Sequence, residues 1–270
     1  MTVNGLRFFI TGGAAGLGAG TARVVAREGG VVTICDVNDE PGRRLVEEIN
    51  AAGGTALYVH CDVTQEREVI DAMRISAETQ GSIDVLHNNA GIHDTRLHPE
   101  PTLDNLTADH FRRVLEVDLV APWVCAKAAL PYLRKSPNAS IINAGSVASF
   151  AGYATNLCYG AAKGGIAMLT KNLALALAPD RIRVNCYCPG AFETEGAMIY
   201  AERVGKETFV KTQTAAHLVP RLGKPEEIGH LVCFLASEKA AFINGVTYLI
   251  DGGALAWRGT IDQLGMEPIL

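Results

Sequence analysis

Thr11-Gly12-Gly13-Ala14-Ala15-Gly16-Leu17-Gly18 stands between an apolar run, Leu6 to Thr11, and a helical pattern from about Gly16 to Glu28. Glycine is needed where a backbone turns tightly or approaches a ligand closely. A helix that begins directly after such a turn presents free N–H groups and a partial positive charge. This strand–turn–helix unit predicts a pyrophosphate-binding turn, although a purely structural turn would use the same residue types.

Strand-length apolar runs alternate with helical patterns along the rest of the chain. Continuous apolar strands separated by helices are typical of a parallel sheet covered on both faces. We therefore expect an α/β fold, a single doubly wound (Rossmann) domain over residues 1–270 with a seven-stranded parallel sheet flanked by helices, because no linker divides the chain. The expected strands are Leu6–Thr11, Val31–Cys35, Ala56–His60, Ile83–Asn88, Ala139–Asn143, Arg181–Cys186 and Gly245–Ile250. Further helices are expected near Pro41–Ala52, Gln65–Thr79, Leu103–Leu133, Asn156–Leu177 and Pro225–Leu235. Residues 191–222 are expected to form a substrate lid, and residues 254–270 a C-terminal tail.

Composition limits the classes of function. With 270 residues, 48% of them hydrophobic and 20% charged, the chain can bury a large core. A net charge of −5 without a basic cluster argues against a nucleic acid or membrane partner. The N-terminus carries no cleavage signal, so we expect a cytoplasmic protein whose seven cysteines are reduced. No metal site is expected, because His93, Asp94 and His98 lack regular ligand spacing.

Asp36 ends the second expected strand, where a carboxylate can accept hydrogen bonds from an adenosine ribose diol. A 2′-phosphate at that place would be repelled. Neither the glycine turn nor Val37 and Asn38 supply a basic group that would bind such a phosphate. The residues therefore favour NAD over NADP as the cofactor.

The Gly-x-x-x-Gly-x-Gly spacing and the motifs that follow it resemble the short-chain dehydrogenase/reductase family, in its compact single-domain form. The resemblance runs from Thr11 to Gly253, with motifs in the family's order. These motifs are Cys61-Asp62-Val63, Asn88-Asn89-Ala90-Gly91, Ser146, Tyr159-Gly160-Ala161-Ala162-Lys163, Pro189-Gly190 and Asp251-Gly252-Gly253.

The resemblance implies a set of cofactor contacts. Asp62 and Val63 would hold the adenine edge, and Asn89, Ala90 and Gly91 would line the ribose. The turn from Pro189 to Thr194 would meet the nicotinamide carboxamide through the backbone at Phe192 and the Thr194 hydroxyl. The expected cofactor-binding set is Gly12, Gly16, Leu17, Gly18, Asp36, Asp62, Val63, Asn89, Ala90, Gly91, Tyr159, Lys163, Pro189, Gly190, Phe192 and Thr194.

Tyr159 and Lys163 are four residues apart on an expected helix, so their side chains lie on one face. An ammonium beside a phenol favours phenolate, and the cationic ring of oxidised nicotinamide acts in the same direction. A pKa lowered by about 3 units from the usual value near 10 needs roughly 4 kcal/mol of charge stabilisation. We expect Tyr159 to be the general acid/base. By resemblance, Lys163 tunes it and reaches the nicotinamide ribose, and Ser146 holds the substrate oxygen.

Asp118 departs from the family pattern, which usually has asparagine at this place. The family role rests partly on the main-chain carbonyl, which binds a water leading to the lysine. Pro122 lies four residues later and lacks the N–H that would bond the Asp118 carbonyl. We expect the carbonyl relay to survive, with a plain polar helix residue as the alternative.

The expected activity is hydride transfer between NAD and a small-molecule secondary alcohol or ketone on a ring or apolar body. Two alternatives stay open, a non-catalytic NAD(H)-sensing protein and a cofactor-independent lyase or dehalogenase on the same scaffold. The helices at 103–133 and 156–178 are apolar on two faces, for example at Val120, Trp123 and Met168. We therefore expect a homo-oligomer, a tetramer or dimer, with the tail packing across its interface.

Overall fold

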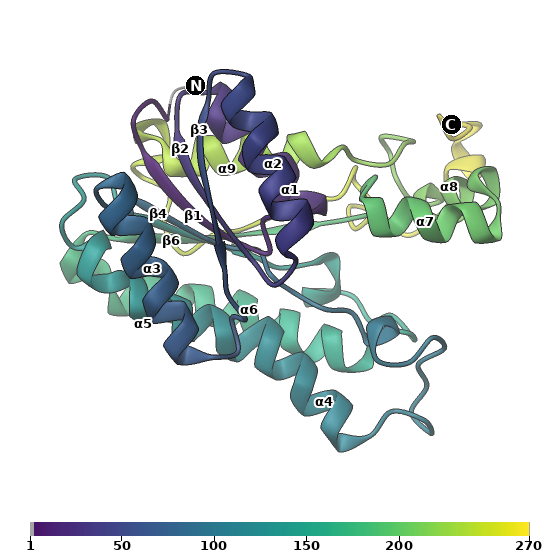
Figure 1. The fold of residues 1–270 in the computed structure, drawn as a ribbon. Coiled ribbons are helices and arrows are strands. Elements are labelled where there is room, and N and C mark those ends of the chain that lie inside the picture. The colour runs from purple at the N-terminus through teal and green to yellow at the C-terminus, as the bar shows by residue number, and fades with distance from the viewer. Residues whose placement is uncertain (1–2, 270) are drawn as a thin grey trace.

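A parallel sheet of seven strands, in the order β3-β2-β1-β4-β5-β6-β7, forms the centre of the molecule (Figure 1). The computed structural model describes residues 3–269, with the side chain of Tyr200 excepted. The expected seven-stranded doubly wound sheet is confirmed, with strand ends shifted by a few residues. The strands are β1 (Arg7–Thr11), β2 (Val31–Asp36), β3 (Thr55–His60), β4 (Val85–Asn88), β5 (Ser140–Ala144), β6 (Arg183–Pro189) and β7 (Thr247–Ile250).

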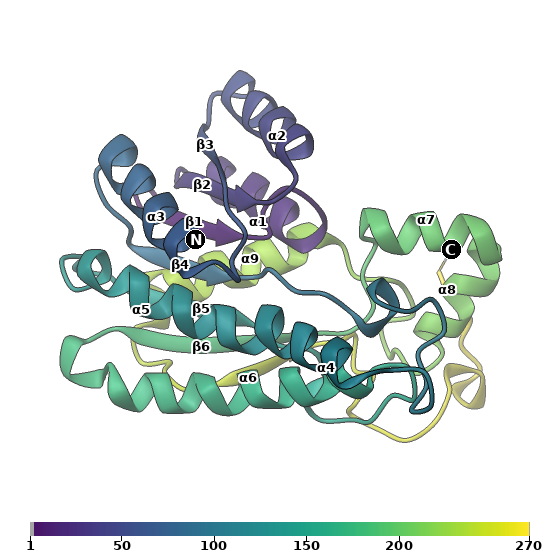
Figure 2. The same ribbon diagram turned by 60° about the horizontal axis from the view of Figure 1, so that its bottom comes forward.

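Helices cover both faces of the sheet, as Figures 1 and 2 show from two directions. The layer on one face consists of α1 (Gly16–Arg27), α2 (Asp39–Ala51) and α9 (Pro225–Ala236). The layer on the other face consists of α3 (Glu66–Gln80), α5 (Ala121–Leu133) and α6 (Leu157–Ala176). Each layer packs its apolar residues against one face of the sheet, which gives two large buried clusters. Burial on both faces explains why the strands are apolar at consecutive positions rather than at alternate ones.

The strand order reverses direction between β1 and β4, which pair in parallel beside each other at the middle of the sheet. In an open α/β sheet, ligands bind outside the carboxyl ends of the strands at such a reversal. The glycine turn follows β1, Asp36 closes β2, and Asn89 follows β4. The topology therefore brings these three motifs to one edge.

The expected helix from Leu103 to Leu133 is not one regular helix. It begins as α4 (Ala108–Leu115), because the Thr107 hydroxyl caps it by accepting from the His110 N–H at 3.2 Å. A π-helical turn, Glu116–Val120, then leads into α5, and the Ala121 N–H donates to the Glu116 carbonyl five residues back. Pro122, which has no N–H, is the second residue of α5 and lies two residues after this turn. The wider turn places Asp118 in the interior.

The expected lid contains two helices, α7 (Glu195–Val204) and α8 (Lys206–Thr214), which extend away from the sheet (Figure 1). The C-terminal tail, which was expected to pack across a subunit interface, lies beside these two helices of the same chain. Within the tail, the Trp257 indole N–H donates to the Ala216 carbonyl at 2.9 Å, and the Ile261 N–H donates to the Ala215 carbonyl at 2.8 Å. The tail is therefore attached to the segment that follows α8.

No helix within residues 3–269 combines the length and the apolar character needed to cross a bilayer. The same residues contain no group of three or more metal-ligating side chains. All seven cysteines are buried free thiols.

Candidate active site

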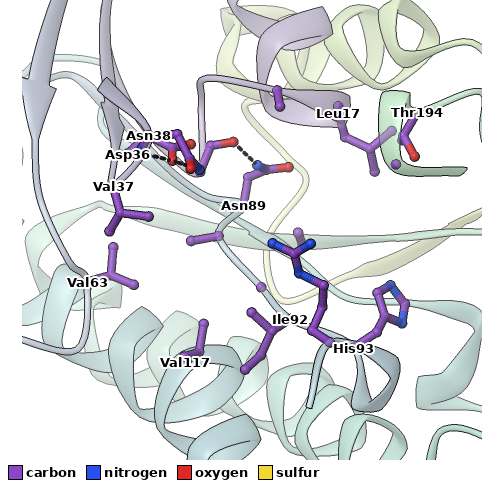
Figure 3. A pocket seen from close by; sticks show the side chains of 18 of the residues that line it. Leu17, Asp36, Val37, Asn38, Val63, Asn89, Ile92, His93, Val117 and Thr194 are labelled. Carbon is purple, nitrogen blue, oxygen red and sulfur yellow. Dashed lines mark hydrogen bonds between the residues drawn. The ribbon is translucent and has the colours of Figure 1, made fainter. Parts of the chain in front are cut away.

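A cavity of about 560 Å³ runs along the carboxyl ends of the strands, from Asp36 to Tyr159. Figure 3 shows Asp36 and Val37 on one side of this cavity, and Leu17 and Thr194 on another. Most of the expected cofactor-binding residues line it. These are Gly12, Gly16, Leu17, Asp36, Asp62, Val63, Asn89, Ala90, Gly91, Tyr159, Lys163, Pro189 and Thr194.

The glycine turn has the geometry that its sequence predicts. Gly12 and Gly16 have φ values of +60° and +53°, a backbone region that other residues rarely adopt. Gly18 does not line the cavity but allows α1 to approach the turn, since a Cβ there would lie 2.2 Å from the Gly12 carbonyl oxygen. Ala15 caps α1 without a side-chain hydrogen bond, and no acidic residue lies in the first turn. The first N–H groups of α1 thus lack a side-chain cap and can bind an anion.

Asp36 is held at the end of β2 by three hydrogen bonds. Its Oδ2 accepts from the Ala14 N–H at 3.0 Å, and its Oδ1 accepts from the main-chain and side-chain N–H groups of Asn38. The carboxylate is thereby fixed against the glycine turn. Because a carboxylate has about four acceptor positions, it can still accept from a diol in the cavity.

Asn89 links the end of β4 to the glycine turn. Its side-chain amide donates to the carbonyls of Thr11 and Gly12 at 3.1 and 2.9 Å, and its Oδ1 accepts from the Tyr187 hydroxyl. The residue that was expected to line the ribose therefore also supports the turn.

Tyr159 and Lys163 lie on α6 and both face the cavity. The Lys163 Nζ lies 5.4 Å from the centre of the Tyr159 ring. The His93 ring is stacked on Tyr159, with the ring centres 4.0 Å apart. Ser146, at 7% exposure, follows β5, and its hydroxyl accepts from the Ala148 N–H at 3.1 Å. The expected proton-transfer residues are thus brought to one place.

Two acceptors fix the Lys163 ammonium. It donates to the Ala144 carbonyl at 2.9 Å, and it lies 3.1 Å from the Asp118 Oδ2. Asp118 was expected to act through its main-chain carbonyl, and its carboxylate was not expected to contact the lysine. The structure adds this ion pair, because the π-helical turn places the Asp118 side chain inside, at 0% exposure.

The pKa of Tyr159 was expected to fall, and the protein by itself raises it above the ordinary tyrosine value. Burial is the main cause, because it disfavours the phenolate. The Lys163 charge lowers this pKa, the Asp118 charge raises it, and the Ser146 hydroxyl lowers it by hydrogen bonding. The lysine alone therefore does not outweigh the desolvation of the phenol.

Two other expected cofactor contacts, Gly190 and Phe192, do not line the large cavity. Phe192 is buried against Gly223 and lines a separate cavity of about 200 Å³. Gly190 allows close packing on Asp251, whose Cα would lie 2.9 Å from an added Cβ. Gly190 and the Phe192 side chain therefore contribute to the packing of the turn after β6.

Asp94 and Arg96 have places that the sequence did not predict. The Asp94 carboxylate, at 0% exposure, accepts from the main-chain N–H groups of Cys158 and Tyr159 at 2.9 and 3.0 Å. Arg96 lines the large cavity and has no ion-pair partner among residues 3–269. No local sequence pattern predicts either position, because each depends on how this loop packs against parts of the chain that are distant in sequence.

Comparisons with known proteins agree with this arrangement. A family model described as enoyl-(acyl carrier protein) reductase matches residues 12–254. The cis-4-hydroxycyclohexanecarboxylate dehydrogenase of Sinomonas cyclohexanicum is 37% identical over 248 residues, which cover 92% of this chain and 95% of that protein. The L-fucose dehydrogenase of Oryctolagus cuniculus is 35% identical over 246 residues, covering 91% and 83%.

Solved structures share the fold. The crystal structure of gox2181 matches with a TM-score of 0.86 and 24% identity, covering 95% of this chain and 98% of that one. A structure from Agrobacterium tumefaciens matches with the same TM-score, 29% identity and the same coverage. The glycine turn, the Tyr159–Lys163 pair and this agreement over most of the chain lead to one conclusion: the chain belongs to the short-chain dehydrogenase/reductase family of oxidoreductases.

Proposed function

We propose that this protein is an NAD-dependent oxidoreductase that transfers a hydride between the nicotinamide and a secondary alcohol or ketone. The observation that carries the proposal is the position of Tyr159 and Lys163. Both lie on the wall of a cavity that also contains the glycine turn and Asp36. The proposed cofactor phosphate site and the proposed proton-transfer group therefore line the same cavity.

The residues fit a dinucleotide. The N–H groups at the start of α1 would hold the pyrophosphate, and Asp36 would accept from the adenosine ribose. Thr194, Pro189 and Gly91, which also line the cavity, would contact the nicotinamide end. When bound, the dinucleotide gives or takes the hydride, and its oxidised ring brings a positive charge.

Tyr159 is the proposed general acid/base. In alcohol oxidation its phenolate takes the hydroxyl proton, and in ketone reduction its phenol donates a proton to the carbonyl oxygen. Lys163 and the bound cationic ring both favour the phenolate against the effect of burial. Ser146 is proposed to orient the substrate oxygen from the end of β5.

The substitution Tyr159→Phe tests the proposal directly. It removes the exchangeable proton and leaves the ring stacked on His93, so NAD binding should be unchanged while kcat falls by about 10²- to 10⁴-fold. Isothermal titration with NAD and the absorbance of reduced nicotinamide measure the two quantities. Weak NAD binding together with an intact kcat would reverse the assignment of Tyr159.

Two alternatives remain as outcomes of the same measurements. A non-catalytic NAD(H)-sensing protein would bind NAD and turn over no member of a broad alcohol and ketone panel. A cofactor-independent lyase or dehalogenase would need neither the glycine turn nor Lys163, so the presence of both disfavours it.

The proposed substrate carries its hydroxyl on a ring. The relatives named above act on 4-hydroxycyclohexanecarboxylate and L-fucose, both of which are cyclic in their usual forms. Arg96 supports an anionic group on the substrate ring, since this residue lines the cavity and its side chain has no ion-pair partner in residues 3–269. A comparison of 4-hydroxycyclohexanecarboxylate with cyclohexanol tests this point, and equal kcat/KM for both would exclude carboxylate recognition.

We further propose a homo-oligomer in the cytoplasm. Trp123 on α5 and Met168 and Leu175 on α6 are exposed by 47%, 55% and 76%. Exposed apolar residues on two neighbouring helices favour a second copy of the chain as the partner. Sedimentation velocity of the purified protein measures the assembly.

A further inference from the structure

The Asp118–Lys163 ion pair lies in the interior of the protein. The Asp118 side chain is 0% exposed and that of Lys163 is 4% exposed, with 3.1 Å between Oδ2 and Nζ. Removing two charges from water costs free energy that their attraction does not always return. A buried carboxylate beside the lysine is therefore not explained by stability alone.

The pair has a fixed geometry. The Asp118 Oδ1 accepts from the Ile92 N–H at 2.8 Å, which ties the carboxylate to the segment after β4. Its Oδ2 has no hydrogen-bond partner of good geometry within residues 3–269, so the lysine charge is its compensation. Gly91 leaves room for the pair, because a Cβ there would lie 2.8 Å from the same oxygen. The carboxylate can thus hold the ammonium from one side while the Ala144 carbonyl holds it from another.

The charges around Tyr159 come from several elements. Lys163 on α6 favours the phenolate, and Asp118 on the π-helical turn disfavours it. The hydrogen bond with Ser146, which follows β5, lowers the pKa of Tyr159, and Cys188 on β6 raises it. His93 stacks on the ring, with the ring centres 4.0 Å apart. Asp118 is the group in this set that directly offsets the lysine.

We propose that Asp118 acts through its carboxylate as a positioning residue, which fixes the Lys163 ammonium beside Tyr159 and sets the pH range in which Tyr159 exchanges its proton. The proposal rests on the proposed function of Tyr159 as acid/base. An enzyme with a neutral side chain at this position would reach the phenolate at lower pH.

The variant Asp118→Asn tests the carboxylate, because asparagine keeps an oxygen that can accept from Ile92 and loses the charge. In alcohol oxidation the rising limb of the kcat/KM profile should move to lower pH by about one unit. This is the low end of the pKa shift that a nearby charge causes. Burial then also lowers the pKa of Lys163, whose counter-charge is gone, so a falling limb should appear at high pH. Glu116→Gln, a loss of charge on the same π-helical turn, should leave the profile unchanged.

Titration of the protein without cofactor separates this proposal from the proposed function. The phenolate absorbance that disappears in Tyr159→Phe should begin at lower pH in Asp118→Asn than in the parent protein. If no alcohol is oxidised but this shift appears, the catalytic proposal fails, and only the effect of Asp118 on the Tyr159 titration is retained. If the Tyr159 titration and the rising limb are both unshifted in Asp118→Asn, the role of Asp118 is excluded.

A double-mutant cycle on thermal stability measures the coupling between Asp118 and Lys163 without an activity assay. Lys163→Met leaves a lone buried carboxylate, which is strongly destabilising, whereas the same change in an Asp118→Asn background leaves none. The loss of Tm caused by Lys163→Met should therefore be several degrees smaller in that background. Equal losses in the two backgrounds would show that the pair has no energetic coupling and would overturn the proposal.

Discussion

At the scale of single residues, Asp36 is the carboxylate that we propose to select the cofactor. Its position was predicted from the sequence, because it ends the second expected strand, which follows the helix that begins at the glycine turn. Its hydrogen bonds to Ala14 and Asn38 were not predicted, and they fix the charge in the cavity. A fixed charge discriminates better than a mobile one, because it cannot move away from a second anion.

Asp36→Asn should therefore weaken the preference for NAD. Asparagine can still accept from Ala14 but no longer repels a 2′-phosphate, so the ratio of kcat/KM for NADP to that for NAD should rise by roughly tenfold or more. Steady-state kinetics with both cofactors measures this ratio. Asp39→Asn is the matched control, since Asp39 lies three residues later and its side chain is 53% exposed. A ratio that stays constant in Asp36→Asn would mean that this carboxylate does not determine the cofactor.

Residue identities were predicted better than residue contacts. Tyr159, Lys163 and the glycines belong to local motifs, so their spacing alone places them on one helix face or in one turn. The Asp118 carboxylate meets Lys163 only because a helix with a π-helical turn packs beside α6. Such a contact depends on packing between elements, and no periodicity in the sequence records it.

At the scale of elements, α6 depends on a cap from a distant loop. Asn156 precedes the helix without a side-chain capping hydrogen bond, and the Asp94 carboxylate binds the Cys158 and Tyr159 N–H groups instead. A carboxylate at a helix N-terminus also interacts favourably with the helix dipole. Asp94 therefore fixes the start of the helix that carries both Tyr159 and Lys163.

Asp94→Ala should lower the free energy of unfolding by about 1 to 3 kcal/mol, because it leaves two buried N–H groups without an acceptor. Asp94→Asn retains one acceptor oxygen and should lose less. Urea denaturation of both variants measures the difference, with the exposed Asp109→Ala as a control for the loss of a surface charge. Equal stability of Asp94→Ala and the parent protein would show that water replaces the cap at no cost.

Element types were predicted well and element ends less well. The alternation of apolar strands and helical patterns gave all seven strands. The expected start of one helix at Leu103 was wrong, because the Thr107 cap starts α4 later, and the expected regular path to Leu133 was wrong at the π-helical turn. Capping and the missing N–H of a proline act on single hydrogen bonds, which hydrophobic periodicity does not resolve.

At the scale of the whole molecule, the sheet order brings the glycine turn, Asp36, Asn89 and the end of β5 to one edge. Helices α7 and α8, which belong to the proposed lid, and the C-terminal tail lie together at one side of the molecule, as Figures 1 and 2 both show. Ile199 on α7 and Thr194 just before it line the cavity. The tail is thus connected, through the segment after α8, to the part of the chain that borders the site.

Removal of residues 257–270 should loosen the lid without unfolding the sheet. Between the described residues of this segment and the rest of the chain, three hydrogen bonds would be lost, from Trp257 to Ala216, from Ile261 to Ala215 and from Ile269 to Pro220. Amide exchange should rise in α7 and α8 while that of the central strands stays slow, because lid segments have low local stability. KM for the alcohol should increase several-fold, and Trp257→Phe, which loses one of these bonds and keeps an aromatic ring, should show a smaller change in both quantities. If the truncated protein keeps the parent's exchange rates in α7 and α8, the tail does not restrain the lid, and any change in KM must come from another contact.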